Sequence, residues 1–337
     1  MRIMRFLMLA LLACALALPA WAGNEDRAGT SGAGELRIPV SGRGIALGSG
    51  IMADVSGVDA MYYNPAGLSG LAGTELYFSH LTYIADMDKN YFAGAVKTGY
   101  GAFGFTVDVL SVGDIPITTV DQPEGTGQTY SPTFTVVGGT YSRFLTDAVS
   151  VGLSAKVVNE SVIDVSATGV AFDVGLQYRP SWKNLRLGML LRDFGPNMKY
   201  SGSGFESFQS VNSDPTAATH VLTSESASFE LPSTFQVGAS YTPYDQGDHR
   251  LVGYGNFTNN NFGRDEYSLG VEYTYHNMLS LRASDAVTGQ SDYLYGPAYG
   301  IGVKVPLGNS SAQVDYAIRT VRNYFANNQV FSIKFAF

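Results

Sequence analysis

The sequence predicts an all-β protein: a closed antiparallel transmembrane β-barrel of about 14 strands, with the N-terminal segment plugging its lumen. Residues 329–337 alternate as a strand does, with Phe331, Ile333, Phe335 and Phe337 on one side. The chain has 39 Gly and 21 Tyr but only 15% charged residues, and no apolar run after its N-terminus is long enough for a membrane helix. Short and long loops alternate. Because lipid offers no water to an unpaired N–H or C=O, such strands must close into a ring.

The N-terminus has the marks of a secretory signal that is cut after Ala22. Arg2 and Arg5 precede an apolar run over residues 6–18. A lipoprotein signal ending at Cys14 is the competing interpretation, but the apolar run continues past that residue. Cys14 is the only cysteine, so the mature chain is expected to have no disulfide, thiolate nucleophile or cysteine metal ligand.

Charge narrows the class of partner. The whole chain has 21 basic and 29 acidic residues, a net charge of −8. Removing Arg2 and Arg5 with the signal leaves 19 basic against 29 acidic residues, a net charge of −10. An acidic mature protein argues against nucleic acid as a partner. With an export signal and strands that need lipid, the expected location is the bacterial outer membrane, and outer-membrane lipid is an expected partner.

Three regions follow from the composition: the signal over residues 1–22, an N-terminal segment over residues 23–73 and the barrel over residues 74–337. The segment is dense in Gly, Asn and Pro, which specify turns and close backbone packing instead of a long regular element. We expect it to plug the lumen. No Pro-rich or Ser-rich linker divides the rest of the chain, which favours one large β domain.

The candidate strands alternate between apolar and polar residues. They are residues 74–81, 91–98, 101–111, 132–141, 149–159, 167–178, 185–193, 232–241, 251–257, 267–275, 279–285, 298–305, 312–319 and 330–337. The pattern is clearest where Val170, Phe172 and Val174 alternate with Ala171 and Asp173, so that one face suits lipid and the other a crowded polar interior. An even number of strands is what single-chain bacterial barrels require.

Loop lengths test the same fold independently. Outer-membrane barrels alternate short periplasmic turns with long outer loops. The long connections here are residues 113–130, 194–231 and 286–297, and those between them are short, with both barrel ends on the short side. A soluble sandwich has no reason to sort its loops in this way.

Charged residues on the inward face form a candidate lumen polar network. Its members are Asp108, Lys156, Asp173, Arg186, Arg192, Glu272 and Asp315, with Arg282, Lys304 and Arg319 also predicted to face inward. A salt-bridge network that stiffens the barrel is the favoured interpretation, and a polar conduit is the alternative. Inward glycines such as Gly152, Gly175 and Gly300 make room for a bulky segment inside.

We expect no catalytic residue, metal ligand or cofactor. The four histidines are widely separated, and no pair has metal-binding spacing. The long loop over residues 194–231 mixes Tyr200, Phe205 and Phe208 with small polar residues, which suits a protein-binding surface. A lid over an apolar ligand and a self-packed loop remain alternatives.

Two N-terminal stretches carry a family resemblance. Residues 41–50 include Gly42, Arg43, Gly44 and Gly48, and residues 59–68 end in Asn64-Pro65-Ala66-Gly67-Leu68. In that order they resemble the signature shared by PorV/PorQ proteins and FadL-type fatty-acid transporters. Four later stretches are similar to the PorV/PorQ pattern: residues 166–173, 182–188, 192–196 and 231–233.

The resemblance implies a FadL-like barrel whose N-terminal segment, including the motif residues, folds into the lumen. It also implies a role in one of two classes. PorV-like proteins serve type IX secretion, so the first expectation is a non-enzymatic barrel that binds exported protein cargo or secretion components at the cell surface. The alternative is a FadL-like transporter for long-chain fatty acids or other hydrophobic compounds, with a hydrophobic small molecule as its partner.

Overall fold

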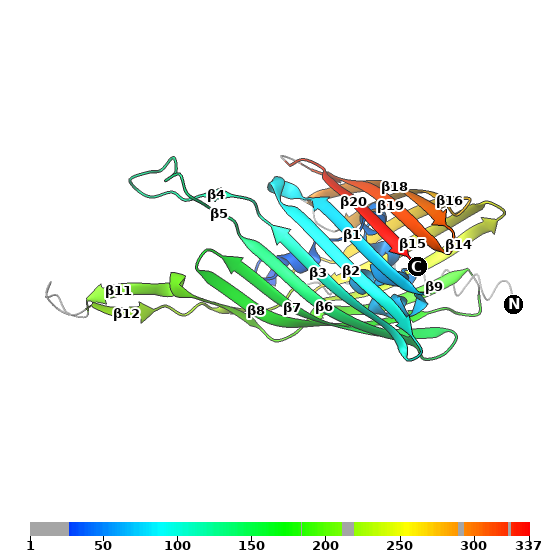
Figure 1. Ribbon diagram of the computed structural model, residues 1–337, viewed down its shortest axis with the longest axis horizontal. Helices are drawn as coiled ribbons and strands as arrows, with labels where there is room; N and C mark the ends of the chain where they lie inside the picture. Colours follow the sequence, from blue (N-terminus) through cyan, green and yellow to red (C-terminus); the bar gives the residue numbers. More distant parts are fainter. Residues whose placement is uncertain (1–26, 183, 211–218, 289–292, 323–324) are drawn as a thin grey trace.

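The structure is a computed structural model that describes residues 27–182, 184–210, 219–288, 293–322 and 325–337. The expected signal peptide lies outside the described residues. Fourteen antiparallel strands form a closed barrel (Figure 1). They are β1 (Thr74–Thr82), β2 (Asp88–Thr98), β3 (Gly101–Ser111), β6 (Thr133–Phe144), β7 (Val149–Val162), β8 (Val165–Tyr178), β9 (Leu185–Phe194), β14 (Thr234–Gln246), β15 (His249–Asn260), β16 (Glu266–Tyr275), β17 (Leu279–Thr288), β18 (Tyr295–Leu307), β19 (Ser310–Val321) and β20 (Asn328–Ala336).

The predicted strands and the closure of the ring are confirmed. Each predicted segment overlaps one barrel strand, and each strand pairs with its neighbours around the ring. The last strand pairs with the first, from Thr82 opposite Gln329 to Glu75 opposite Ala336. The ring therefore leaves no strand edge facing lipid at this seam. No helix among the described residues is both long enough and apolar enough to cross a membrane.

The predicted facing of the strands is also confirmed where the alternation is clearest. On β8 the side chains of Phe172 and Val174 are 40% and 42% exposed, whereas Asp173 and Gln177 are 1% and 2% exposed. Because side chains alternate along a strand, the exposed set faces the membrane and the buried set faces the lumen. The barrel thus turns its aromatic and aliphatic residues outward and its charged residues inward.

The long loops carry small strands outside the ring. They are β4 (Ile115–Pro116), β5 (Thr129–Tyr130), β10 (Met198–Ser201), β11 (Glu206–Ser210), β12 (Thr219–Thr223) and β13 (Ser228–Phe229), and a 3-10 turn, η7 (Ser203–Phe205), precedes β11. In Figure 1 the β4–β5 and β11–β12 hairpins extend beyond the same end of the barrel, away from the marked C-terminus. That end is the outer one by the loop-length rule, and the short-turn end is periplasmic.

The N-terminal segment forms six short helices inside the ring. They are η2 (Gly34–Arg37), α2 (Gly42–Ala46), η3 (Gly50–Ala53), η4 (Gly57–Asp59), α3 (Ala60–Tyr63) and η5 (Pro65–Gly70), and one more turn, η6 (Ile84–Asp86), joins β1 to β2. In Figure 1 the blue coils lie among the strands. The segment is almost wholly buried, and its helices contact strands on every side: η5 touches β6, β7 and β8, η3 touches β9, β14 and β15, and α2 touches β17 to β20.

Inward glycines set how close the segment lies to the wall. A Cβ added at Gly152 or Gly175 would lie closer than 3.0 Å to the Asn64–Pro65 unit, and one added at Gly300 would lie equally close to Ala46. Real Cβ atoms do not approach other atoms so closely. These positions therefore require glycine because the helices occupy the space that a side chain would fill.

Replacement of Gly152 by Val is expected to destabilise the folded barrel by about 1 to 3 kcal/mol or more, because the side chain would collide with backbone that cannot move aside. Gly139→Val is the matched control, since nothing lies within 4 Å of the Cβ that would be added there. Urea unfolding in lipid vesicles measures both variants. Equal midpoints for the two would show that the segment does not pack against Gly152.

Candidate functional site

A first ion cluster lies where β8 meets β9. Lys156 Nζ is 2.7 Å from Asp173 Oδ2 and 2.6 Å from Asp193 Oδ1, and Arg192 Nε is 3.0 Å from Asp193 Oδ2. The strand register shifts here, and Asp193 adopts a left-handed backbone conformation with φ of 55°. The extra residue of this bulge lets Arg192 and its neighbour Asp193 both be buried, although alternation alone would face one of them outward.

A buried lysine links this side of the barrel to the N-terminal segment. Lys89 is 1% exposed, and its Nζ lies 3.0 Å from Asp108 Oδ2. The same Nζ donates to the backbone oxygens of Glu35 and Ile38 at 2.8 and 2.7 Å. The predicted network missed Lys89 because the expected strand began at residue 91. Its parity with Tyr91, which is also buried, could have placed it inward.

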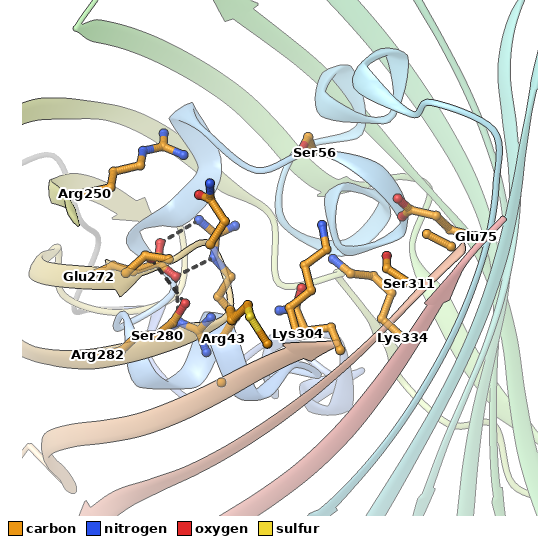
Figure 2. A pocket seen from close by; sticks show the side chains of 16 residues that line it. Arg43, Ser56, Glu75, Arg250, Glu272, Ser280, Arg282, Lys304, Ser311 and Lys334 are labelled. Atoms are coloured by element: carbon orange, nitrogen blue, oxygen red, sulfur yellow. Dashed lines mark hydrogen bonds and ion pairs between the residues drawn. The ribbon is translucent and has the colours of Figure 1, made fainter. Parts of the chain in front are cut away.

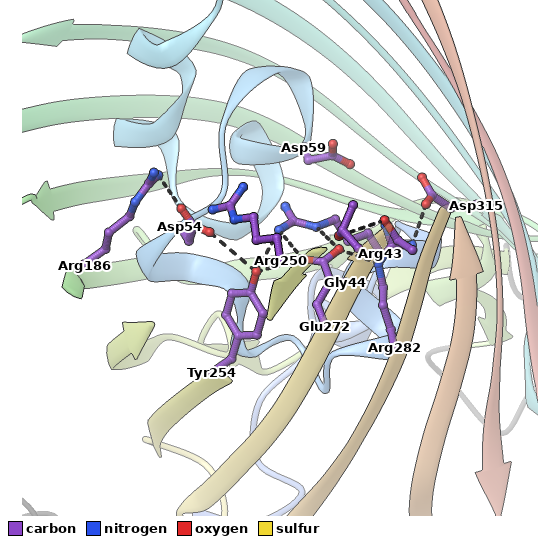
Figure 3. A network of polar contacts seen from close by, with 12 residues as sticks. Arg43, Gly44, Asp54, Asp59, Arg186, Arg250, Tyr254, Glu272, Arg282 and Asp315 are labelled. Carbon is purple, nitrogen blue, oxygen red and sulfur yellow. Dashed lines mark hydrogen bonds and ion pairs between the residues drawn. The ribbon is translucent and has the colours of Figure 1, made fainter. Parts of the chain in front are cut away.

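A second ion cluster fastens α2 to the opposite wall. Glu272 accepts from Arg43 Nη2 at 2.9 Å, from Arg282 Nε at 2.7 Å and from the Tyr254 hydroxyl at 2.8 Å. Arg282 Nη1 then lies 2.5 Å from Asp315 Oδ1. Figure 3 shows these side chains converging from α2 and from the strands. Arg43 is the only one of them that the N-terminal segment supplies.

The same network continues along the segment to β9. Asp54 pairs with Arg186 and lies 3.5 Å from the Tyr254 hydroxyl (Figure 3). The seven predicted network residues therefore do not form one group. Asp108, Lys156, Asp173 and Arg192 lie on the β8 side, and Arg186, Glu272 and Asp315 lie on the other. Local pattern in the sequence did not reveal Asp54 or Asp193 as partners.

The motif residues have packing roles. Asn64 is fully buried, and its Nδ2 donates to the backbone oxygens of Met52 and Leu176, both at 3.1 Å. Its Oδ1 accepts from the backbone N–H of Ala66, which caps η5, and Pro65 begins that turn. Gly67 lies against the backbone of residue 55, so a side chain would not fit. The Asn-Pro-Ala-Gly sequence thus ties the segment to β8.

The glycines around Arg43 serve the same packing. A Cβ added at Gly44 would collide with the Tyr63 ring, and Gly42 donates its N–H to Ser332 Oγ at 3.4 Å. Gly48 has φ of 60°, which favours glycine. These contacts bring α2 close enough to the wall for Arg43 to reach Glu272.

Two cavities lie between the segment and the β14–β20 wall. The periplasmic basin, about 520 Å³ in volume, lies at the short-turn end and is lined by Arg43, Arg250, Arg282, Lys304 and Lys334, with Glu75 and Glu272. Figure 2 shows Arg43, Glu272 and Arg282 meeting at one side of it, and Lys304 and Lys334 projecting into it. The outer vestibule, about 400 Å³ in volume, lies at the long-loop end. Its charged and aromatic lining is Arg37, Arg192, Arg319, Glu266, Tyr62, Tyr83, Tyr293 and Tyr295.

Residues 42–50, which we call the barrier, separate the two cavities. On β16, Glu266 lines the vestibule and Glu272 lines the basin. Between them, Ser268 lies against Gly48, and Gly270 lies against Leu47, with an added Cβ at Gly270 only 3.2 Å from the Leu47 backbone oxygen. The barrier therefore covers the wall between the two cavities, and the Arg43–Glu272 pair holds it there.

A third hollow faces the membrane. It has a volume of about 710 Å³ and is lined mainly by outward side chains of β3, β6, β7, β8 and β9, including Phe103, Tyr141, Leu153, Phe172 and Phe194. Its position on the outer wall suits contact with lipid chains.

A carboxyl group in the segment is poised to titrate. Glu35 is 4% exposed, and both of its carboxyl oxygens lack a hydrogen-bond partner with good geometry. Burial, together with the neighbouring Glu160 carboxylate, raises the pKa of Glu35 from 4.5 to about 8. Glu160 itself accepts from the Ala33 N–H at 3.0 Å and from the Tyr200 hydroxyl.

Barrel stability is therefore expected to fall as pH rises from roughly 5 to 9, because the folded state holds the Glu35 proton and the unfolded state releases it. The contribution is complete below the unfolded pKa and is lost as pH passes the folded value. Urea midpoints across this range measure the slope, and Glu35→Gln should flatten it. Glu124→Gln, in an exposed loop, is the control and should keep it. A parallel slope in both variants would contradict the assignment.

Two of the three outer-loop aromatics, Tyr200 and Phe205, have side chains that the structure describes, and both are half-buried. Tyr200 is partly buried, its ring centroid lies 5.4 Å from that of Phe229, and its hydroxyl donates to Glu160. Tyr200 therefore contributes to the packing of the barrel end, and its expected role as a partner contact stays a prediction. Phe205 ends η7 and is half-buried, and Phe208 lies in β11 opposite Val221.

No group of three or more His, Cys, Asp or Glu side chains in the described ranges could hold a metal ion. No family model matches the chain, and no curated protein matches its sequence.

Solved structures do match. The chain is similar to the CymD monoaromatic hydrocarbon channel, with a TM-score of 0.54 and 15% identity over 88% of this chain and 97% of that one. The Pseudomonas putida toluene transporter TodX gives a TM-score of 0.56 with 14% identity, covering 86% and 97%. The Ralstonia pickettii toluene transporter TbuX gives 0.55 with 14% identity, covering 85% and 96%. The chain shares the barrel fold of these three structures.

The closed barrel, which this chain shares with outer-membrane proteins, places the protein in the outer membrane, as expected. Matches at such low identity show the fold alone. They extend over nearly the whole length of the three structures. The finer PorV/PorQ resemblance has no support among these matches.

Proposed function

We propose that the protein is a non-enzymatic outer-membrane channel for small hydrophobic compounds, the alternative of the two functions that the sequence suggests. The observation that carries the proposal is the pair of cavities at opposite ends of the lumen, with the barrier of residues 42–50 between them. The names of the structural neighbours, hydrocarbon channels and toluene transporters, support the same class of solute.

The vestibule has the size and lining of a small-molecule site. Pockets for such ligands measure roughly 300 to 1,000 Å³ and combine aromatic walls with a few polar groups. The tyrosines of the vestibule provide the walls, and the arginines and Glu266 provide the polar groups. A compound bound there would reach the basin once the barrier moved away from β16.

A reversible disulfide tests this route. Gly42→Cys with Ser332→Cys joins α2 to β20, because a Cβ added at residue 42 would lie 3.1 Å from Ser332 Oγ. The mature chain is expected to have no other cysteine. Toluene entry into vesicles whose outer leaflet is lipopolysaccharide should fall at least about tenfold when the pair is oxidised, and recover on reduction.

The single variant Gly42→Cys is the control and should transport equally under both conditions. If the oxidised double variant admits toluene as fast as the reduced one, the route through the barrier is rejected. If toluene entry is also lost in the reduced double variant, the substitutions themselves and not the disulfide block transport. The single Ser332→Cys variant would then show the same loss.

A surface for an exported protein is the second candidate function. The observation that favours it is the β11–β12 hairpin, which projects beyond the outer end of the barrel (Figure 1) and exposes 52% of Val221 and 46% of Leu222. Deleting residues 206–223 should abolish recovery of exported proteins with the tagged barrel from outer membranes, if this surface binds them. Deleting the β4–β5 loop is the control, and unchanged recovery after the first deletion would reject the hairpin as the binding surface.

A further inference from the structure

The outer vestibule has one wall made of tyrosines. The rings of Tyr293 and Tyr295 meet edge to face with centroids 5.8 Å apart, and the hydroxyls of Tyr83 and Tyr295 are hydrogen-bonded. These contacts fix the rings as a group on the cavity surface, although they come from different strands and loops. Fixed aromatic rings are good partners for a flat apolar ligand, since stacking requires little further ordering.

Arginine side chains lie beside these rings. Arg319 Cζ lies 3.9 Å from the centroid of the Tyr295 ring, and Arg319 Nη2 donates to the Tyr293 hydroxyl at 3.0 Å. Arg37 Nη2 donates to Asn260 Oδ1 at 3.3 Å. Neither guanidinium forms an ion pair with a carboxylate in the part of the chain that the structure describes, so each has donors to offer a ligand.

The other charged groups of the vestibule are already engaged. Arg192 pairs with Asp193 and lies 3.8 Å over the Tyr62 ring. Glu266, the one acidic side chain in the lining, accepts from the Tyr293 hydroxyl at 2.7 Å. The cavity thus presents two guanidiniums without an ion pair and one carboxylate next to an aromatic wall, a net positive lining in a protein whose overall charge is negative.

We propose that the vestibule binds an aromatic carboxylate, with its carboxylate at Arg319 and Arg37 and its ring against Tyr83, Tyr293 and Tyr295. A guanidinium matches a carboxylate through paired N–H donors and also stacks on aromatic rings. A neutral hydrocarbon would contact the rings but leave both guanidiniums unneutralised. A small aliphatic acid would satisfy the guanidiniums and leave the rings unused.

The far cavity has the same sign of charge. The periplasmic basin has five basic side chains and two acidic ones in its lining. Lys304 forms no ion pair with a described carboxylate, and Arg250 lies 3.9 Å from Asp245. An anion that passed the barrier would therefore enter a second cavity with a favourable potential. This inference rests on the proposed channel function and narrows its substrate to compounds that combine a ring with a carboxylate.

Equilibrium dialysis of radiolabelled benzoate against the purified full-length protein in detergent tests the site. Benzoate is expected to bind saturably and to be displaced at least about tenfold less effectively by acetate or by toluene. Arg319→Gln and Arg37→Gln should each weaken benzoate binding about tenfold or more, and added salt should weaken it in the wild type. Arg143→Gln, an exposed arginine that lines neither cavity, is the matched control and should bind as the wild type does.

Arg319→Lys separates folding from recognition. Lysine retains the charge but lacks the planar guanidinium. The benzoate affinity of Arg319→Lys should therefore lie between the affinities of the wild type and Arg319→Gln, and its urea midpoint should equal that of the wild type. Benzoate binding that is absent in the wild type, or equal in the wild type and Arg319→Gln, overturns the proposal. Displacement by acetate as effective as by benzoate overturns the role of the tyrosines.

The two proposals fail in different ways. If toluene entry responds to the disulfide between residues 42 and 332 but benzoate does not bind, the channel stands and its substrate class is wrong. If benzoate binds through Arg319 but no solute crosses in the reduced state, the site stands and the channel is rejected.

Discussion

Replacing Glu272 by Gln is expected to release α2 from the barrel wall and to destabilise the barrel by about 3 to 5 kcal/mol. Glu272 is 6% exposed and lies between the guanidiniums of Arg43 and Arg282, with both of its oxygens engaged. The amide keeps the shape but removes the negative charge, so Arg282 would keep Asp315 while Arg43 would lose the carboxylate with which it pairs. Leaving buried charge without its partner is costly because the low dielectric does not screen it.

Two measurements check this expectation. The urea midpoint in lipid vesicles should fall, and ion conductance through single barrels in a planar bilayer should rise as the barrier loosens. Asp245→Asn is the control, because the Arg250–Asp245 pair is largely exposed, with a separation of 3.9 Å, and such pairs contribute about 1 kcal/mol or less. A Glu272→Gln barrel that remains as stable and as tightly closed as the wild type would mean that packing alone holds α2.

Replacing Lys156 by Met is expected to have an effect of similar size on the other side of the lumen, about 3 to 5 kcal/mol. Its ammonium lies between Asp173 and Asp193, whose side chains are each 1% exposed. Methionine fills a similar volume without the charge, and the two carboxylates would then repel each other with only Arg192 close to one of them. The result should be a lower urea midpoint and loss of order at the β8–β9 bulge.

Lys199→Met is the matched control for this substitution. Lys199 pairs with Glu225 at 2.9 Å, but the two side chains are 47% and 85% exposed, so solvent already screens the pair. Hydrogen exchange of residues 190–194 locates the effect, and Asp173→Asn in the Lys156→Met background should recover part of the loss. Unchanged exchange and an unchanged midpoint in Lys156→Met would contradict the assigned role.

The sequence could predict the barrel because its signals are local. Alternation of period two assigns each strand residue to lipid or lumen, and on β8 it separated Phe172 from Asp173 correctly. The alternation of short and long loops indicated which end of the barrel is periplasmic and which is outer. The inward glycines also indicated that a bulky segment lies inside the barrel. The structure agrees, because the N-terminal segment occupies the space that a side chain at Gly175 or Gly300 would fill.

Of the two functions that the sequence suggests, we propose the alternative and not the first expectation. The resemblance of the later stretches favoured a secretion role, whereas the structural neighbours have names that favour transport of hydrophobic compounds. Tyr200 shows that loop composition alone does not separate the alternatives, because an aromatic among small polar residues can cover its own barrel as readily as it can bind a partner.

The sequence by itself determined the ring, the facing of its strands and the acidic, cysteine-poor character expected of the mature chain. Only the tertiary structure decided which charges meet, because Arg43 and Glu272 lie 229 positions apart and no local period relates them. The bulge that turns Asp193 inward breaks the alternation on which the prediction depended. The cavities also depend on the tertiary structure. They are the spaces left between the barrel wall and the N-terminal segment, whose position the long-range ion pairs fix.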